Sequence, residues 1–381
     1  MISSRDYGRN VVLGVRDVTA DRPGGQVLHL VPALFDSRDG VIGGAERYVL
    51  ELARHMAAVV PTRLVTFGQR ERQERIGSLQ LRVIGDPWLV RGQRSNPVSV
   101  AILGEVRRAA VVHCHQQHVL SSSVAAAAAR LLGRRVFCTD LGGGGWDVSG
   151  YVSTDSWYHG HLHISEYSRR VAGQDRLTRA RVVLGGVDAD RFSPAAATSS
   201  DGTILFVGRL LPHKGIDILV DAVAPGMRVE IIGPAPDPCY LDELRARALG
   251  KQITFRFDCN DDALVEAYRR AACVVLPSVY RDMYGGETRV PELLGQTLLE
   301  GMACGVPGVC TDVASLPEVV EHGVTGLVVP PNDAAALRQA LDWMLTHADE
   351  RAVLGANARR RVMERFNWNR VVDRCLEAYA A

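Results

Sequence analysis

The segment FVGRLLPHKG (206–215) combines two cations with a predicted strand end. The apolar run before it predicts a strand that ends at Val207, and Arg209 and Lys214 follow in the loop before the next helix. Both cations would then lie at the carboxyl end of a sheet strand, near a helix N-terminus whose amides favour anions. This arrangement suits a nucleoside diphosphate, and the cations would stabilise charge that collects on a leaving phosphate. The alternative is a pair of solvated surface cations.

Two carboxylates occur in PELLGQTLLEGMACGVPGVCTD (291–312). We expect Glu292 in a loop and Glu300 in a helix that begins near Gly295. The first-turn amides of Gly295, Gln296 and Thr297 would be free to hold phosphate or sugar oxygens. A carboxylate is a natural acceptor for sugar hydroxyls, and one near a ribose could accept from two of them. Taken alone, the stretch also permits two solvent-exposed glutamates.

The segment VIGGAER (41–47) places Gly43 and Gly44 directly before a predicted helix. Two glycines there allow the backbone to approach a ligand closely. The segment is not a dinucleotide fingerprint, because no GxGxxG occurs in the chain. Taken alone, it is also compatible with a plain helix start.

The strand VVHCH (111–115) ends in two histidines. Because strand side chains alternate, His113 and His115 share one face, with His115 nearer the loop. A histidine at such a position is often structural. The pair could suggest a metal site, but the spacing offers no third ligand, and we expect no metal. The DAD sequence at 188–190 looks like a metal-binding Asp-x-Asp signature, but it follows a strand and turn at the end of the first half and is not expected to bind metal.

Strand and helix patterns alternate along the whole chain, which predicts an α/β fold with parallel sheets covered by helices. We expect two Rossmann-like, doubly wound domains that face each other across a cleft, because ligands bind at the carboxyl ends of such strands. The division predicted is an N-terminal, acceptor-side domain over 1–195, a C-terminal, donor-side domain over 196–360, and a C-terminal helix over 361–381 that packs back toward the first domain. The small polar stretch SPAAATSSDG (193–202) is typical of a linker. The predicted strands are 26–32, 62–67, 110–115, 134–140 and 161–165, then 203–210, 227–233, 253–257, 272–278, 306–312 and 325–331.

The composition, 47% hydrophobic and 23% charged, is that of a globular protein. No apolar run approaches the roughly 20 residues of a membrane span, no secretory signal is evident, and the eight cysteines form no CxxC pair. We therefore expect a cytoplasmic protein. Residues 1–195 contain 25 Arg against 18 Asp plus Glu, whereas residues 196–381 contain 19 basic against 25 acidic residues. The basic first half could attract an anionic acceptor or the inner face of a membrane, or form a solvated arginine-rich surface.

Taken in order, these segments resemble the retaining glycosyltransferase family 4, which has the GT-B fold. The resemblance rests on GGAERYVLELA, VVHCHQ, VVLGGVDADRFSP, LFVGRLLPHKGIDILVDAV, TLLEGMACGVPGVCTDVASLPEVVEHGVTGLVVPPND and the terminal RFNW. It implies an NDP-sugar donor with Arg209 and Lys214 on the diphosphate, Glu300 on the ribose, and Glu292 with the backbone of Gly295, Gln296, Thr297 and Leu298 on the sugar. It implies that Gly43, Gly44 and His115 lie near the diphosphate and the anomeric carbon.

The resemblance also implies a reaction class. The sugar would pass to a hydroxyl acceptor, which could be a glycan, a lipid-linked glycan or a small molecule, with retention of anomeric configuration. The leaving phosphate oxygen would take the acceptor proton. Neither a cofactor nor a divalent metal is implied, and neither is nucleic acid. The catalytic residues implied are His115, Glu292, Arg209 and Lys214. Base, sugar, acceptor and oligomeric state are not specified.

Two loops depart from the family pattern or extend it. The loop VYRDMYGGETRVP (279–291) is about ten residues longer than usual, and its Glu287 competes with Glu292 for the sugar-binding role. The glycine-rich TDLGGGGWDVSGY (139–151) is expected to contribute to the acceptor site. Competing functions are a nucleotide-sugar epimerase, a nicotinamide-dependent dehydrogenase and a non-catalytic sugar-nucleotide binder. The missing GxGxxG counts against the dehydrogenase.

Overall fold

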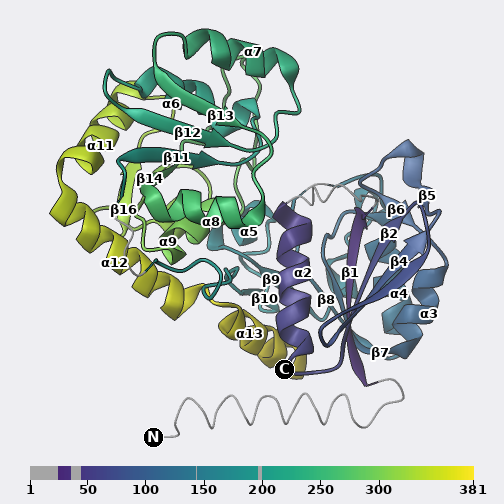
Figure 1. Ribbon diagram of the computed structural model, residues 1–381. Helices are drawn as coiled ribbons and strands as arrows, with labels where there is room; N and C mark the ends of the chain where they lie inside the picture. Colours follow the sequence, from purple (N-terminus) through teal and green to yellow (C-terminus); the bar gives the residue numbers. More distant parts are fainter. Residues whose placement is uncertain (1–24, 36–43, 143, 196–199) are drawn as a thin grey trace, which may run out of the picture. The chain divides into compact units, whose positions relative to one another are not determined.

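The computed structural model describes residues 25–35, 44–142, 144–195 and 200–381, and it divides the chain into two compact units. Unit 1 comprises Met1–Gly186 together with Trp368–Ala381, and unit 2 comprises Val187–Asn367 (Figure 1). In the described part of the chain, none of the helices has the length and apolar character needed to cross a membrane.

The unit boundaries differ from the predicted 195/196 and 360/361. Residues 187–195 are held by unit 2: Phe192 packs edge-on against Tyr268 with ring centroids 5.8 Å apart, and Arg359 donates to the carbonyls of Ala189 and Phe192 at 3.2 and 3.0 Å. The first boundary was predicted from the linker-like composition of 193–202. The structure places it earlier, because residues 187–195 already pack in unit 2.

The second boundary differs because the C-terminal helical stretch is broken. Helix α12 (Ala348–Arg365) ends in unit 2, and α13 (Trp368–Ala380) begins after Phe366 and Asn367. The prediction of one C-terminal helix over 361–381, which runs through RFNW (365–368), was therefore wrong, because two helices share this stretch. Helix α13 packs against α2 (Gly44–Ala57) inside unit 1, as the yellow and purple helices of Figure 1 show.

Unit 1 is built on an eight-stranded sheet in which every strand pair is parallel except β3–β4. Its strand order is β10 (Ala180–Val182), β9 (Gly160–His163), β8 (Arg135–Cys138), β7 (Ala109–Cys114), β1 (Gln26–Leu34), β2 (Thr62–Gly68), β4 (Leu79–Gly85) and β3 (Arg72–Ile76). The sequence analysis found most of these strands but missed the β3–β4 hairpin, since RQERI is polar and lies exposed at the sheet edge. The remaining elements are α3 (Ala101–Arg108), α4 (Leu120–Leu131), α5 (Glu166–Val171), the short pair β5 (Trp88–Leu89) and β6 (Pro97–Val98), and the 3₁₀ turns η1 (Val90–Gly92), η2 (Val148–Gly150) and η3 (Asp155–Trp157).

The alternation of side chains along β1 sorts this unit into two layers around the sheet. Leu28 and Leu30 join an apolar cluster that includes Ile102 of α3 and Ala125 of α4. His29 points the other way and contacts Met56 of α2. One face of the sheet is therefore an ordinary hydrophobic core, and the other contains buried polar side chains.

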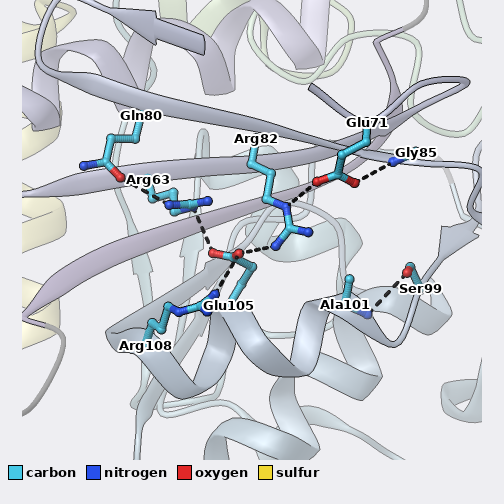
Figure 2. A network of polar contacts seen from close by, with 9 residues as sticks. All are labelled: Arg63, Glu71, Gln80, Arg82, Gly85, Ser99, Ala101, Glu105 and Arg108. Atoms are coloured by element: carbon cyan, nitrogen blue, oxygen red, sulfur yellow. Dashed lines mark hydrogen bonds and ion pairs between the residues drawn. The ribbon is translucent and has the colours of Figure 1, made fainter. Parts of the chain in front are cut away.

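A buried carboxylate joins α3 to the strands of unit 1. Figure 2 shows Glu105, whose side chain is fully buried, between three guanidinium groups. Arg63 of β2 approaches one carboxylate oxygen at 2.9 Å, while Arg82 of β4 donates to the other at 2.5 Å, and Arg108 lies 3.4 Å from that same oxygen. Arg82 also bonds Glu71 at 2.9 Å. Because a buried charge requires such partners, this network fixes α3 against β2 and β4.

Unit 2 contains a six-stranded, wholly parallel sheet. The strand order is β13 (Gln252–Arg256), β12 (Arg228–Ile232), β11 (Thr203–Val207), β14 (Ala271–Leu276), β15 (Gly308–Thr311) and β16 (Gly326–Val329). Its helices are α6 (Ile216–Ala222), α7 (Pro238–Arg247), α8 (Asp261–Arg270), α9 (Gln296–Ala303), α10 (Leu316–Val319), α11 (Ala334–Thr346) and α12, with the 3₁₀ turn η4 (Pro212–Lys214). All six predicted strands are present, and both units are doubly wound α/β domains as predicted.

Candidate functional site

The strand order of unit 2 marks one place in the sheet where a ligand is expected. From β11 the chain first proceeds to β12 on one side and later returns to β14 on the other. In an open α/β sheet, ligands bind outside the carboxyl ends of two strands at such a switch point. The loop after β11 carries Arg209 and Lys214, and the loop after β14 carries Ser278 and Glu292. The predicted charged residues therefore follow the two strands that flank the switch point.

Glycine allows these two loops to touch. Gly215 ends the turn η4 in the left-handed region, with φ of 64°. A Cβ atom there would lie 2.0 Å from the carbonyl oxygen of Pro277, which no side chain can tolerate. The amide of Val279 also donates to the carbonyl of His213 at 2.9 Å. The loop that carries Lys214 is thereby fixed directly against the end of β14.

Lys214 and Glu292 form an ion pair at this place. Their side chains are 15% and 10% exposed, so the pair is largely shielded from water but not sealed. The hydroxyl of Ser278 donates to the same carboxylate oxygen of Glu292 at 3.0 Å. The neighbouring His213 is half-buried, and burial together with the adjacent ammonium group of Lys214 lowers the pKa of its imidazole. The site thus presents one cation, one carboxylate and a neutral ring close together.

Helix α9 begins beside this pair. Gly295 is its N-cap residue with φ of 77°, and a Cβ there would approach Leu316 Cδ2 to 2.8 Å. The helix starts at Gln296, one residue from the predicted start, and Thr297 and Leu298 follow in its first turn. The amide of Leu298 already donates to the carbonyl of Gly295 at 3.0 Å. Amides in the first turn of a helix, such as that of Thr297, are in general suited to hold oxygens of a bound anion or sugar.

Glu300 lies one turn further along α9 and is 3% exposed. The phenol of Tyr268, on α8, donates to its Oε2 at 2.8 Å. The structure thus brings Lys214 and Glu292 into contact, whereas Glu300 is bonded to Tyr268. Arg209 lies exposed on the loop after β11.

The long loop 279–291 contains Glu287, the alternative to Glu292 for the sugar-binding role. Glu287 is exposed and forms a β-bridge with Arg281 inside the loop, where Asp282 accepts from the amides of Tyr284 and Gly286, both at 2.9 Å. The loop is therefore a self-contained hairpin. Its Tyr280 is anchored by the amide of Ala314 at 2.8 Å.

The structure describes two further segments that the sequence analysis considered, the glycines before α2 and the DAD segment at 188–190. Gly43 lies outside the described residues. Gly44 begins α2, and no atom of the described chain lies within 4 Å of a Cβ placed there, so space does not explain a glycine at this position. In DAD, the carboxylate of Asp188 accepts from the amides of Asp190 and Arg191 at 3.2 and 3.0 Å, which is a local turn.

His115 is buried in unit 1 and belongs to a cluster of three histidines. The predicted common face of His113 and His115 is confirmed, since their ring centroids are 4.2 Å apart. The third member is His29, which the spacing did not reveal because it belongs to the neighbouring strand β1. His29, Ser278 and Tyr268 are the site residues that sequence reasoning missed. For Ser278 a signal existed, because it ends the Pro-Ser pair at the carboxyl end of a predicted strand.

The glycine-rich loop 139–151 borders a cavity of unit 1. The side chains of Gln93 and Asn96 hold the loop through the backbone of Trp146, at 3.1 and 2.8 Å. The adjacent cavity has a volume of about 350 Å³ and is lined by Gln117, His118 and the segment 149–155. These side chains are hydroxyl, amide, carboxylate and aromatic groups, which suit a polyhydroxylated ligand.

The two Rossmann-like domains define the GT-B fold, and solved structures share it over nearly the whole chain. HepE of Anabaena, solved in complex with UDP and glucose, matches with a TM-score of 0.69 and 17% identity, over 92% of this chain and 98% of its own. A glycosyltransferase of Rickettsia africae matches with a TM-score of 0.71 and 18% identity, over 93% of this chain and 97% of its own. At these identities the likeness is one of fold.

Residues 188–361, nearly the whole of unit 2, match the family model described as Glycosyl transferases group 1. Similar curated proteins include the D-inositol 3-phosphate glycosyltransferase of Saccharomonospora viridis, 33% identical over 224 residues, which cover 52% of this chain and 49% of that protein. The D-rhamnosyltransferase WbpZ of Pseudomonas aeruginosa is 32% identical over 200 residues, covering 49% and 50% of the two chains. The chain thus spans about half the length of the curated relatives it matches.

Proposed function

We propose that the protein is a retaining glycosyltransferase of family 4 that moves a sugar from a nucleoside-diphosphate sugar to a hydroxyl acceptor. The observation that carries the proposal is the contact between Lys214 and Glu292 at the switch point of unit 2, beside the N-terminus of α9. A cation, a carboxylate and helix amides together match a ligand that has both a diphosphate and hydroxyl groups. The complex of HepE with UDP and glucose supports this class of donor.

The roles follow from charge. Lys214 and Arg209 bind the diphosphate, and their attraction strengthens as the glycosidic bond breaks and negative charge collects on the leaving group. Glu292 turns from Lys214 to the sugar hydroxyls, together with the backbone of Gly295, Gln296, Thr297 and Leu298. Glu300, oriented by Tyr268, accepts from the ribose hydroxyls. We assign to Gly43, Gly44 and His115 the donor contacts that the family resemblance implies.

The acceptor hydroxyl attacks the anomeric carbon from the same face from which the leaving group departs. The proton of that hydroxyl passes to the leaving phosphate oxygen. Configuration is thereby retained, and neither a cofactor nor a divalent metal takes part. We assign the acceptor, a glycan, lipid-linked glycan or small molecule, to the cavity lined by Gln117 and 149–155. The excess of basic residues in 1–195 supports a cytoplasmic location with contact to the inner face of a membrane.

The first experiment is a thermal-shift screen of UDP-, GDP- and ADP-sugars, because a ligand that binds only the folded state raises its stability. The best donor, radiolabelled in the sugar, is then incubated with candidate acceptors with and without EDTA. We expect labelled product in both conditions. Conversion of the sugar nucleotide without transfer would indicate an epimerase and contradict the proposal, and loss of transfer with EDTA would contradict metal independence.

A further inference from the structure

Three histidines on the α2 side of the sheet of unit 1 form a closed group. His29 lies on β1, His113 on the adjacent strand β7 in direct register with it, and His115 immediately after β7. All three are buried. The rings of His29 and His115 are stacked, 5.1 Å apart at an interplanar angle of 15°. The group therefore exchanges hydrogen bonds within the protein rather than with bulk water.

Five of the six ring nitrogens have a partner among the described residues. His29 Nδ1 lies 2.8 Å from His115 Nε2, and His29 Nε2 lies 3.2 Å from the sulfur of Met56. The nitrogens of His113 contact the hydroxyls of Thr139 at 2.8 Å and Tyr379 at 2.7 Å. The sixth nitrogen, Nδ1 of His115, is buried without a partner.

The thioether of Met56 determines where the protons lie. Its sulfur can only accept, so Nε2 of His29 carries the proton in that contact. In a neutral imidazole the other nitrogen, Nδ1 of His29, is then an acceptor. It must accept from His115, whose Nε2 therefore carries the proton. By the same rule, Nδ1 of His115 is a bare lone pair.

The rings are neutral, as this chain of assignments requires. Burial lowers the pKa of His29 to about 3. Burial and the neighbouring rings hold the pKa values of His113 and His115 well below their ordinary value. Near neutral pH each ring therefore has one donor and one acceptor nitrogen.

We propose that His29 is a positioning residue that holds His115 in the tautomer whose Nδ1 accepts a hydrogen bond from a hydroxyl group of the sugar substrate. This inference rests on the proposed function. A buried polar atom without a partner is uncommon in proteins and often has a role in binding or catalysis. A lone pair attracts a hydroxyl but repels phosphate oxygens.

The test compares two substitutions of His29. In His29→Asn, the amide oxygen takes over from Nδ1 as acceptor for His115, whereas His29→Leu removes the acceptor and lets His115 carry its proton on either nitrogen. The ¹⁵N spectrum of histidine-labelled, ligand-free protein distinguishes protonated from unprotonated ring nitrogens, and His115→Gln identifies the signals of His115. We expect an unprotonated Nδ1 of His115 in the wild type and in His29→Asn, and a mixed or reversed tautomer in His29→Leu.

Kinetics provide the second measurement, with the donor found by the thermal-shift screen. We expect His29→Leu to lower kcat/KM by about tenfold, the scale of one lost hydrogen bond, and His29→Asn to restore most of it. Leu28→Val is the matched control, because its side chain is buried on the opposite face of β1. It should lower thermal stability and leave the His115 spectrum unchanged.

Two outcomes would overturn the inference. One is an unchanged His115 spectrum in His29→Leu. The other is stoichiometric binding of Zn²⁺ or Co²⁺ with shifts of all three rings, since one ligand atom from each histidine lies within 4.8 Å of the others and a metal would occupy the lone pairs. The spectra need no sugar nucleotide, so a failed donor screen would contradict the proposed function without affecting the tautomer result.

Discussion

The ammonium group of Lys214 and the carboxylate of Glu292 form an ion pair across the switch point of unit 2, although they are 78 residues apart in the chain. The family resemblance assigns them to different parts of one ligand, the diphosphate and the sugar. In the structure they neutralise each other. In the proposed function, donor binding would exchange this internal ion pair for two contacts with the ligand, so the free energy of the pair would oppose binding.

Neutralising Glu292 should consequently separate anion binding from transfer. In Glu292→Gln, Lys214 loses its partner, and we expect inorganic pyrophosphate to bind more tightly than to the wild type by calorimetry. Transfer should fall by at least about tenfold, because the amide is a weaker acceptor for sugar hydroxyls. Glu287→Gln, in the exposed hairpin, should change neither quantity by more than about twofold. Weaker pyrophosphate binding by Glu292→Gln, or a loss of transfer in Glu287→Gln, would contradict these roles.

Lys214→Ala should have the opposite effect on anion binding. It removes the cation and leaves a carboxylate near the proposed diphosphate position, so pyrophosphate binding should weaken. Transfer should fall on the order of a hundredfold, the usual cost of losing one group that stabilises developing charge. Full transfer activity in Lys214→Ala would exclude the proposed site.

The hydroxyl of Tyr268 is expected to orient Glu300 toward a ribose. Tyr268→Phe deletes the bond of 2.8 Å to the carboxylate, and should lower the free energy of unfolding by about 1 kcal/mol. If Glu300 accepts from ribose hydroxyls, the wild type should bind the nucleoside diphosphate more tightly than its 2′-deoxy analogue. Glu300→Ala should abolish that preference, and Tyr268→Phe should reduce it. Equal affinities of the wild type for both nucleotides, measured by calorimetry, would refute the ribose contact.

Glu105 provides a test of stability within unit 1, which does not change any residue of the charged site of unit 2. Glu105→Ala leaves Arg63 and Arg82, which are 15% and 18% exposed, without their shared partner. We expect a loss of about 3 kcal/mol in the free energy of unfolding, measured in urea. Arg108→Ala is the control: this arginine is 64% exposed, so the loss should stay below about 1 kcal/mol. Equal losses in the two variants would show that the burial of Glu105 does not determine the contribution of the network to stability.

The buried histidines predict a stability that falls with acidification. In the unfolded chain these imidazoles bind protons below about pH 6.5, whereas in the folded protein burial lowers the pKa of His29 to about 3. Between these values the unfolded state binds more protons, so stability is full above pH 6.5 and decreases as the pH falls. Each such histidine contributes roughly 1.4 kcal/mol per pH unit. Urea unfolding at pH 6.5 and 5.5 should show this decrease in the free energy of unfolding. In His29→Asn the decrease should be smaller by about the contribution of one histidine. A pH-independent stability over this range would indicate that the cluster is protonated or open to water.

Local patterns predicted most of the fold, and the exceptions have identifiable causes. Strands such as 203–207 and 271–276 are apolar on both faces, which is typical of buried parallel strands, and they were found. The edge strand Arg72–Ile76 is polar and gave no such signal. The break between α12 and α13 was missed because RFNW contains neither glycine nor proline.

The position of Arg209 and Lys214 on the loop after β11 was predictable, because both residues follow the same apolar strand in the sequence. The candidate site was not predictable where the partner comes from another strand or helix. Ser278 and Tyr268 meet Glu292 and Glu300 through tertiary packing. The same holds for His29, which reaches His115 only because β1 and β7 pair. Spacing within one segment contains no information about such pairs.

The discontinuity of unit 1 has a consequence for biosynthesis. Its sheet ends at Val182, but its helix α13 is encoded after the whole of unit 2, and that helix supplies Tyr379 to His113. In the order of synthesis, all residues of unit 2 are therefore made before α13. Unit 1 can gain the packing of α13 against α2, and the contact of Tyr379 with His113, only after the last residue of unit 2 has been added to the chain. The histidine cluster thus depends on a segment that is synthesised after the whole of the other unit.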